Sequence, residues 1–173
     1  MFRSFLVCLI ISFALAGCGP ERLGSDWQPI EPRVIAPDFT LPQLDGPSVN
    51  LAALRGRIVI MEFWATWCGP CRFSLPSLDV IAKRYRPLGV TVLLINEGED
   101  EARVRVWTRH RFTTPILLDR GQEAGTLYGV RGIPHLLVID QTGRVAYVHE
   151  GYGGGLERSL SLILDQLLGG SHG

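Results

Sequence analysis

The sequence predicts an α/β domain in which a mixed central sheet is flanked by helices. Residues 57–64 and 90–96 are almost continuous apolar runs of the kind found in buried strands, and each is followed by a segment with helical periodicity. Two strand patterns near the C-terminus are separated by a short turn, which adds an antiparallel hairpin. The 173 residues, of which 46% are hydrophobic, suit one domain with a substantial core.

Positive and negative charges are balanced. The chain has 17 lysine and arginine residues against 17 aspartate and glutamate residues, so the formal net charge is zero. The sequence contains no basic block. These features argue against nucleic acid as a partner.

Residues 1–17 have the pattern of a signal peptide. Arg3 supplies a short positive region, and the apolar run at 5–16 is too short to span a bilayer comfortably. The run ends in residues 15–18, LAGC, which resemble the lipobox of bacterial lipoproteins. The resemblance implies that Cys18 is lipidated and becomes the first mature residue; the alternative is an uncleaved N-terminal anchor. In either case the domain would be exported and held at a membrane.

Residues 18–35 carry three prolines and show no periodicity, so we interpret them as an extended tether between the lipid and the domain. The folded domain is expected at 36–170. In chain order, we expect a β-hairpin at 38–41 and 47–51, a helical turn at 51–55, a strand at 57–64, a helix from Gly69 to about Tyr85, a strand at 90–96, a helix at 99–111, a strand at 116–119, a short helix at 122–128, a hairpin at 135–140 and 144–150, and a last helix at 156–168.

Two of the expected helices have further predicted features. Pro76 lies inside the helix that starts near Gly69 and should kink it. The polar face of residues 99–111 is rich in glutamate and arginine, and we interpret it as solvated.

Cys68 and Cys71 stand where the strand at 57–64 gives way to a helix. Free backbone N–H groups and the positive end of the helix dipole stabilise a thiolate at such a position. Two thiols at this spacing can close a disulfide and open it again. Since Cys8 would leave with the signal peptide and Cys18 would carry lipid, this pair would be the only one left, and we interpret it as a redox site.

Cysteine pairs at this spacing also occur in metal sites, at haem attachment points and in structural disulfides. A zinc site would need a second pair of cysteine or histidine ligands at ligand spacing, which the sequence lacks, so we expect no metal site. Covalent haem attachment would need histidine where Arg72 stands, and we expect no cofactor. A purely structural disulfide remains an alternative, although the spacer Gly69-Pro70 favours exchange chemistry.

Residues 62–71, EFWATWCGPC, resemble the active-site segment of thioredoxin. Together with residues 36–41, APDFTL, and 132–134, GIP, they make the chain similar to the TlpA-like (ResA-like) thiol–disulfide oxidoreductases of bacteria, which are anchored to membranes. The similarity covers about residues 35 to 168. It implies a thioredoxin-like fold with an N-terminal β-hairpin and an insertion of the TlpA type at about 90–118.

The resemblance, with the position of each residue, assigns roles around the cysteines. Cys68, nearest the helix start, would be the nucleophile that attacks a partner's disulfide, and Cys71 would resolve the mixed disulfide. Gly69 and Pro70 would set the spacing of the pair. Trp67 would shape the surface beside Cys68 that meets the substrate.

Glu62 is a carboxylate in an otherwise apolar strand, so its pKa should be raised unless it is paired. Thioredoxin carries an acid at the matching place, which implies that Glu62 takes up and returns the proton of Cys71. The alternatives are that its side chain reaches solvent or pairs with an arginine. Some ResA-like proteins have a second acid where Ser74 stands here, so the acid role falls on Glu62 alone.

Ile133-Pro134 resembles the cis-proline loop of the thioredoxin fold, which implies substrate binding by strand-like backbone pairing beside the cysteines. His135 follows where many relatives have threonine. We expect it either to touch the substrate or to face a loop.

These observations predict a lipid-anchored reductase that works in the periplasm or at the cell exterior, as a monomer. Its clients would be exported cysteine-containing proteins, such as apocytochrome c, and a membrane thiol donor would supply electrons. One alternative is a copper-handling protein that binds Cu(I) through the same thiols. Another is a thiol peroxidase, because APDF also opens peroxiredoxin chains, although the peroxidatic cysteine motif is absent.

The lipobox can be tested directly. Cys18→Ala should abolish labelling by a fatty-acid probe and leave an unprocessed precursor, because the resemblance makes this cysteine the lipid acceptor. Cys8→Ala, which removes the other cysteine of the leader, is the matched control. Equal labelling of Cys18→Ala and the wild type would refute the anchor.

Overall fold

The computed structural model describes residues 27–169, so the expected signal peptide, Cys18 and the first half of the expected tether lie outside the described residues. Its elements are β1 (Trp27–Pro29), β2 (Thr40–Leu41), β3 (Val49–Asn50), η1 (Ala52–Leu54), β4 (Ile58–Trp64), α1 (Cys71–Tyr85), η2 (Arg86–Leu88), β5 (Val90–Glu97), α2 (Glu101–Thr108), β6 (Ile116–Asp119), α3 (Glu123–Leu127), β7 (His135–Ile139), β8 (Val145–Glu150) and α4 (Leu156–Gly169). No helix within this range is long and apolar enough to cross a membrane.

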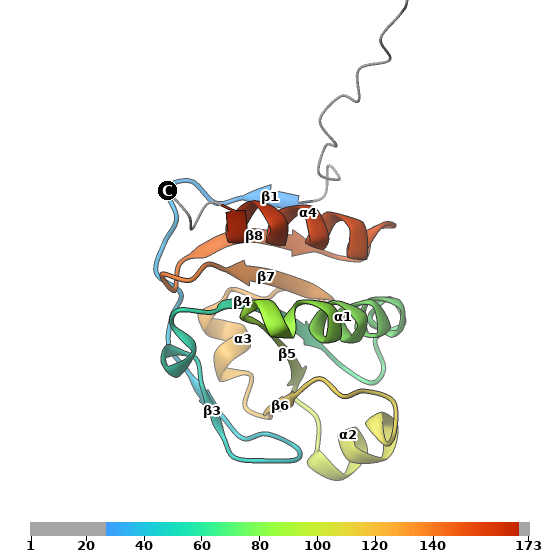
Figure 1. Cartoon of the computed structure of the whole chain (residues 1–173). Helices are drawn as coiled ribbons and strands as arrows, with labels where there is room; N and C mark the ends of the chain where they lie inside the picture. Colours follow the sequence, from blue (N-terminus) through green and yellow to red (C-terminus); the bar gives the residue numbers. More distant parts are fainter. Residues whose placement is uncertain (1–26, 170–173) are drawn as a thin grey trace, which may run out of the picture.

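The main sheet has six strands in the order β1-β8-β7-β4-β5-β6 (Figure 1). Strands β4, β5 and β6 are parallel, whereas β7 runs antiparallel to β4 and β8, and β8 runs antiparallel to β1. The separate pair β2–β3 is the expected N-terminal hairpin. The α/β fold with a mixed sheet is therefore confirmed.

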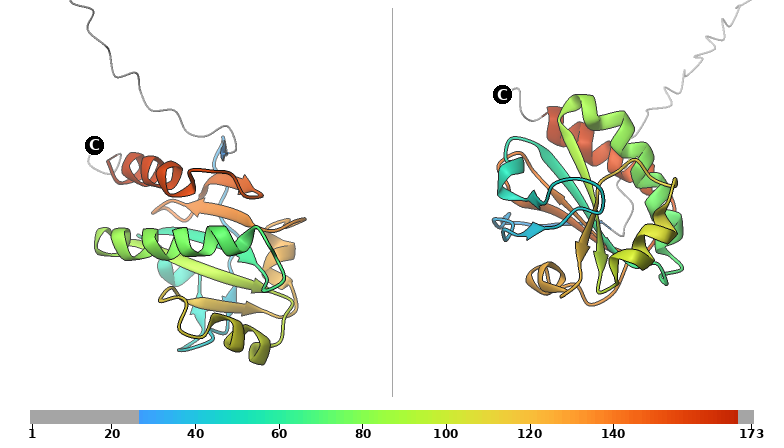
Figure 2. Two further views of the ribbon diagram at one scale, coloured as in Figure 1. Left: turned by 90° about the vertical axis from the view of Figure 1, so that its right-hand side faces the viewer. Right: turned by 90° about the horizontal axis from the view of Figure 1, so that it is seen from below.

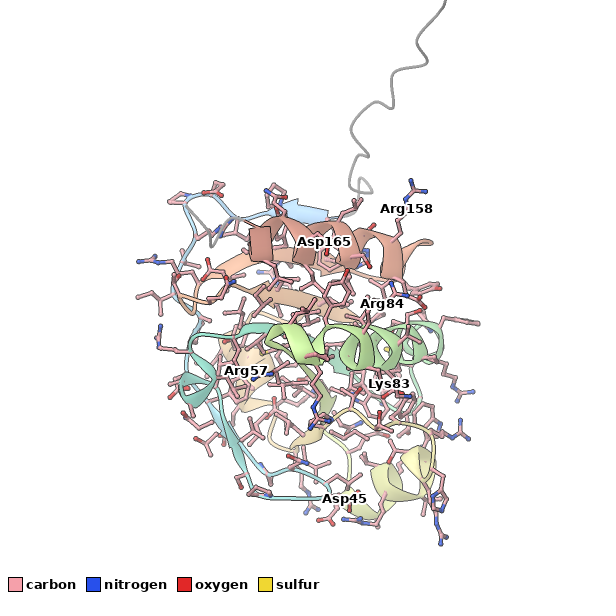
Figure 3. All side chains as sticks on the ribbon, in the orientation of Figure 1. Asp45, Arg57, Lys83, Arg84, Arg158 and Asp165 are labelled. Atoms are coloured by element: carbon pink, nitrogen blue, oxygen red, sulfur yellow. A yellow bond between two sulfur atoms is a disulfide. The ribbon has the colours of Figure 1, made fainter. Side chains whose placement is uncertain are left out.

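Helices cover both faces of the sheet. Helices α1 and α4 lie side by side on one face, and α3 lies on the other (Figure 2). Exposed charged side chains such as Lys83 on α1 and Arg158 on α4 mark the outer surface of this helical layer (Figure 3). The sheet lies between two apolar clusters, one beneath α1 and α4 and the other toward α3.

Strand β4 occupies the middle of the sheet between β5 and β7, and all seven of its residues are buried. Alternate side chains enter opposite clusters: Ile60 and Trp64 face α1 and α4, while Met61 and Phe63 face α3. Such a strand has to be apolar on both faces, which explains the continuous run in the sequence. Its C-terminal end leads through the turn that carries Cys68 into α1.

The structure differs from the sequence interpretation at the tether. Residues 27–29, assigned to an extended tether, form strand β1 and pair with residues 147–149 of β8. The Trp27 side chain is buried, and its ring centroid lies 4.9 Å from that of His149. Burial of a large indole with edge pairing of the sheet explains why this segment joins the domain.

Trp27 should therefore contribute to stability. Trp27→Ala removes a buried aromatic side chain and should lower the free energy of unfolding by about 3 kcal/mol. Gln28→Ala, on the exposed side of the same strand, should change it by less than about 0.5 kcal/mol. Urea denaturation of both variants measures the difference, and an equal, small effect of both would mean that β1 adds little to the fold.

Candidate active site

The two predicted redox cysteines are joined in a disulfide, with an S–S distance of 2.00 Å. The Cys71 N–H, in the first turn of α1, donates a hydrogen bond of 3.2 Å to the Cys68 sulfur. Cys68 is 3% exposed and Cys71 is completely buried. A reduced Cys68 would thus lie at the positive end of the helix, where a thiolate is stabilised, with its partner one turn deeper.

An apolar surface surrounds the cysteine pair. Trp67 and Phe73 are 64% and 65% exposed, and Tyr152 is 44% exposed. The Phe73 and Tyr152 rings lie 5.8 Å apart and, with Gly69 and Pro70, line a shallow hollow beside the disulfide. Trp67 was predicted here. Phe73 and Tyr152 were not, because their pairing joins α1 to the loop after β8.

Glu62 lies beneath the pair with no exposed surface. Its Oε1 accepts a 2.6 Å hydrogen bond from Ser74 Oγ, and within residues 27–169 its Oε2 has no hydrogen-bond partner. Burial raises its pKa to about 8, although the Ser74 bond acts against the shift. The predicted rise is therefore confirmed, and neither alternative, solvent nor an arginine, applies. At neutral pH most Glu62 carboxyls hold a proton.

Ser74 connects Glu62 with the second cysteine, a contact that sequence analysis did not foresee. Its Oγ also lies 3.2 Å from the backbone carbonyl oxygen of Cys71. When Glu62 is protonated, its hydroxyl can donate to Ser74, which can then donate to that carbonyl; when Glu62 is ionised, Ser74 donates to it instead. Ser74 can therefore form a hydrogen bond with Glu62 in either state of the acid.

The Ile133–Pro134 peptide bond is cis, as the resemblance implied. Strand β7 pairs with β4 so that His135 lies opposite Phe63, which puts the proline loop at the same end of the sheet as the cysteines. The Pro134 carbonyl accepts a 2.8 Å hydrogen bond from Gly151 N–H and so holds the loop that carries Tyr152.

His135 corrects an expectation. It is 4% exposed, and its Nδ1 lies 3.8 Å from a Glu150 carboxylate oxygen. Burial lowers its pKa, and the ring packs edge-on against Phe63 at 6.3 Å. The side chain therefore packs in the interior and does not face a loop, because strand β7 turns it inward.

Glu99 also differs from what the sequence predicted. The segment from 99 was expected to present a solvated face, but α2 begins at Glu101 and Glu99 is only 8% exposed. Its carboxylate accepts hydrogen bonds from the backbone N–H and the hydroxyl of Thr66, both at 2.6 Å. Thr66 precedes Trp67, so Glu99 belongs to the surroundings of the active site. Helical periodicity could not reveal a residue that turns inward before the helix starts.

The remaining chemistry of the described residues is simple. Between residues 27 and 169, no group of three or more histidine, cysteine, aspartate or glutamate side chains gathers in a way that could hold a metal ion. The site consists of a dithiol pair, a buried acid with its serine, and an apolar rim. This arrangement can exchange disulfides.

The raised pKa of Glu62 has a consequence for stability. The folded protein binds this proton more tightly than the unfolded chain, so the free energy of unfolding should fall as pH rises from about 4.5 to about 8. Glu62→Gln, measured with the disulfide intact, should lose this pH dependence. At the upper end of the pH range its free energy of unfolding should exceed that of the wild type by on the order of a few kcal/mol. Burial also raises the pKa of Glu97, to about 7. Glu97 is present in both proteins, so its contribution to the pH dependence cancels in the comparison.

Denaturant titrations at several pH values between these limits measure the effect. A Glu62→Gln curve that runs parallel to the wild-type curve would mean that Glu62 does not hold the proton.

Comparisons with known proteins agree with the geometry. Residues 33–160 match the Redoxin family. Thiol-disulfide oxidoreductase ResA of Geobacillus thermodenitrificans is 36% identical over 117 residues, 67% of each chain, and ResA of Bacillus anthracis is 28% identical over 146 residues, 84% of each chain.

Among solved structures, a putative thiol:disulfide interchange protein DsbE from Chlorobium tepidum superposes with a TM-score of 0.74 at 29% identity, covering 79% of this chain and 96% of that one. The exposed lipoprotein thioredoxin Etrx1 of Streptococcus pneumoniae gives 0.68 at 30% identity, covering 76% and 100%. The thioredoxin-like fold is thereby confirmed. The chain belongs to the Redoxin family and is a ResA-like thiol–disulfide oxidoreductase.

Proposed function

We propose that this protein is anchored to a membrane by lipid on Cys18 and reduces the disulfides of exported proteins, such as apocytochrome c. The observation that carries the proposal is the Cys68–Cys71 pair at the start of α1, with a buried acid beneath it. The match to ResA and the likeness to a lipoprotein thioredoxin support its setting.

The exchange proceeds in two steps. The Cys68 thiolate attacks one sulfur of the client disulfide, which forms a mixed disulfide and releases the first client thiolate, which takes up a proton. The Cys71 thiolate then attacks the Cys68 sulfur, closes the disulfide seen here and releases the second client thiol. Two electrons and two protons pass to the client, and a membrane dithiol donor returns them by the reverse exchange.

Glu62 would serve the second step. Cys71 is fully buried, so water is a poor acceptor for its proton. A carboxyl with a pKa of about 8 is ionised in a minor fraction at neutral pH, and in that state it can accept the proton. Ser74, bonded to Glu62 and close to the Cys71 carbonyl, holds the acid in place.

The client would dock on the apolar rim. Trp67 and Phe73 offer exposed rings beside Cys68, and the Pro134 loop lies at the same end of the sheet. An extended client segment could pair with the backbone of that loop while an apolar side chain covers the rings. Docking of this kind places a cystine sulfur in line with Cys68.

The direction of electron flow follows from the surroundings of the thiolate. The Gly69-Pro70 spacer puts no histidine or other cation between the cysteines, and Glu62 adds negative character when ionised. Both features disfavour an unusually stable thiolate. The pair should therefore be a reductant.

Equilibration with glutathione buffers should give a reduction potential close to that of thioredoxin, about −270 mV, rather than about −120 mV as in strong oxidants. A potential near that of strong oxidants would mean that the protein inserts disulfides.

In cells, Cys71→Ser should accumulate mixed disulfides with clients, identified by mass spectrometry, and the double variant Cys68→Ser/Cys71→Ser should trap none. Glu62→Gln should slow resolution but not formation of the mixed disulfide.

A further inference from the structure

A buried carboxylate holds the turn that precedes Cys68. Glu99 lies between β5 and α2, and its two oxygens receive the Thr66 hydroxyl, the Thr66 N–H and Asn96 Nδ2, at 2.6, 2.6 and 2.9 Å. Arg103 approaches the same carboxylate from the solvent side at 3.2 Å. Thr66 and Asn96 are themselves buried.

These contacts keep Glu99 ionised. Burial alone would raise its pKa, but the donors on Asn96 and Thr66, together with Arg103, outweigh that effect and hold the pKa below its ordinary value. Hydrogen bonds to a charged acceptor are stronger than those between neutral groups. The turn is thus held by strong bonds rather than by packing alone.

Thr66 is fixed from two sides. Strand β4 ends at Trp64, so the Thr66 N–H has no ladder partner, and Glu99 supplies the acceptor. The Thr66 carbonyl accepts a 3.3 Å hydrogen bond from the guanidinium of Arg72, which belongs to the first turn of α1. The Cys68 N–H closes the same turn on the Ala65 carbonyl at 3.1 Å.

We propose that Glu99 is a positioning residue for thiol–disulfide exchange: by holding Thr66, it keeps the Cys68 sulfur aligned with the Cys71 N–H at the start of α1. The alignment stabilises the thiolate and directs it outward for attack. The inference rests on exchange at Cys68 and not on the identity of the client or the direction of electron flow.

The test uses the reduced full-length protein. Three variants are compared with wild type: Glu99→Gln, which removes the charge; Thr66→Val, which removes the hydroxyl at nearly constant shape; and Glu101→Gln, which removes an exposed carboxylate two residues from Glu99. Glu101 pairs with Arg105 and not with the turn, so it is the matched control. The rate at which iodoacetamide alkylates Cys68 is measured against pH, by mass spectrometry of the peptide that carries it.

We expect Glu99→Gln and Thr66→Val to slow alkylation at neutral pH by roughly three- to tenfold and to move the pH profile upward, as the weakening of a charge-assisted hydrogen bond would do. The double variant of Glu99→Gln and Thr66→Val should be no slower than the slower single one, because both substitutions act through the contact between Glu99 and Thr66. Glu101→Gln should match wild type, and Thr66→Ser, which restores the hydroxyl, should recover the rate.

Two results would overturn the proposal. If Glu99→Gln and Thr66→Val lower the melting temperature but keep the wild-type alkylation profile, Glu99 stabilises the fold and does not position Cys68. Faster alkylation in Glu99→Gln with no change in Thr66→Val would mean that the residue acts through its charge and not through position. If Glu99→Gln fails to fold, the comparison of Thr66→Val with Thr66→Ser decides the question, since both keep the carboxylate.

Discussion

The complete burial of strand β4 is the constraint on which the rest of the site depends. The strand is paired on both edges and covered on both faces, so a carboxyl at Glu62 has no route to water. The same burial fixes the point at which the chain leaves the sheet, and α1 starts a few residues later at Cys71. The buried acid lies on this strand, and the redox pair and the helix N-terminus follow its C-terminal end, so the three share one location.

Two carboxyls near the cysteines adopt opposite protonation states for a clear physical reason. In the part of the chain that the structure describes, Glu62 has one hydrogen-bond donor, Ser74, and no cation beside it, so desolvation dominates and the proton stays. Glu99 has three donors and the guanidinium of Arg103, so its charge is compensated although it is buried. One acid is thereby suited to exchange a proton, and the other to hold a fixed position.

Local sequence patterns were sufficient for much of this structure. The apolar run of β4, the paired cysteines before a helix, the unfavourable burial of Glu62 and the cis bond before Pro134 were all predicted from residues that are neighbours in the chain or from family motifs. Hydrophobic periodicity also located the helices and strands, apart from β1, to within a few residues, because the spacing of apolar residues follows the geometry of each element.

What the sequence by itself determined was most of the elements and the chemistry of the cysteine pair. Only the tertiary structure decided which distant groups meet. Trp27 joins the sheet by pairing with β8, and Glu99 reaches Thr66 across 33 residues. Ser74 reaches Glu62 from another element, and β7 turns His135 inward. No periodicity encodes such contacts, because they join elements that lie far apart in the sequence and meet only when the chain folds.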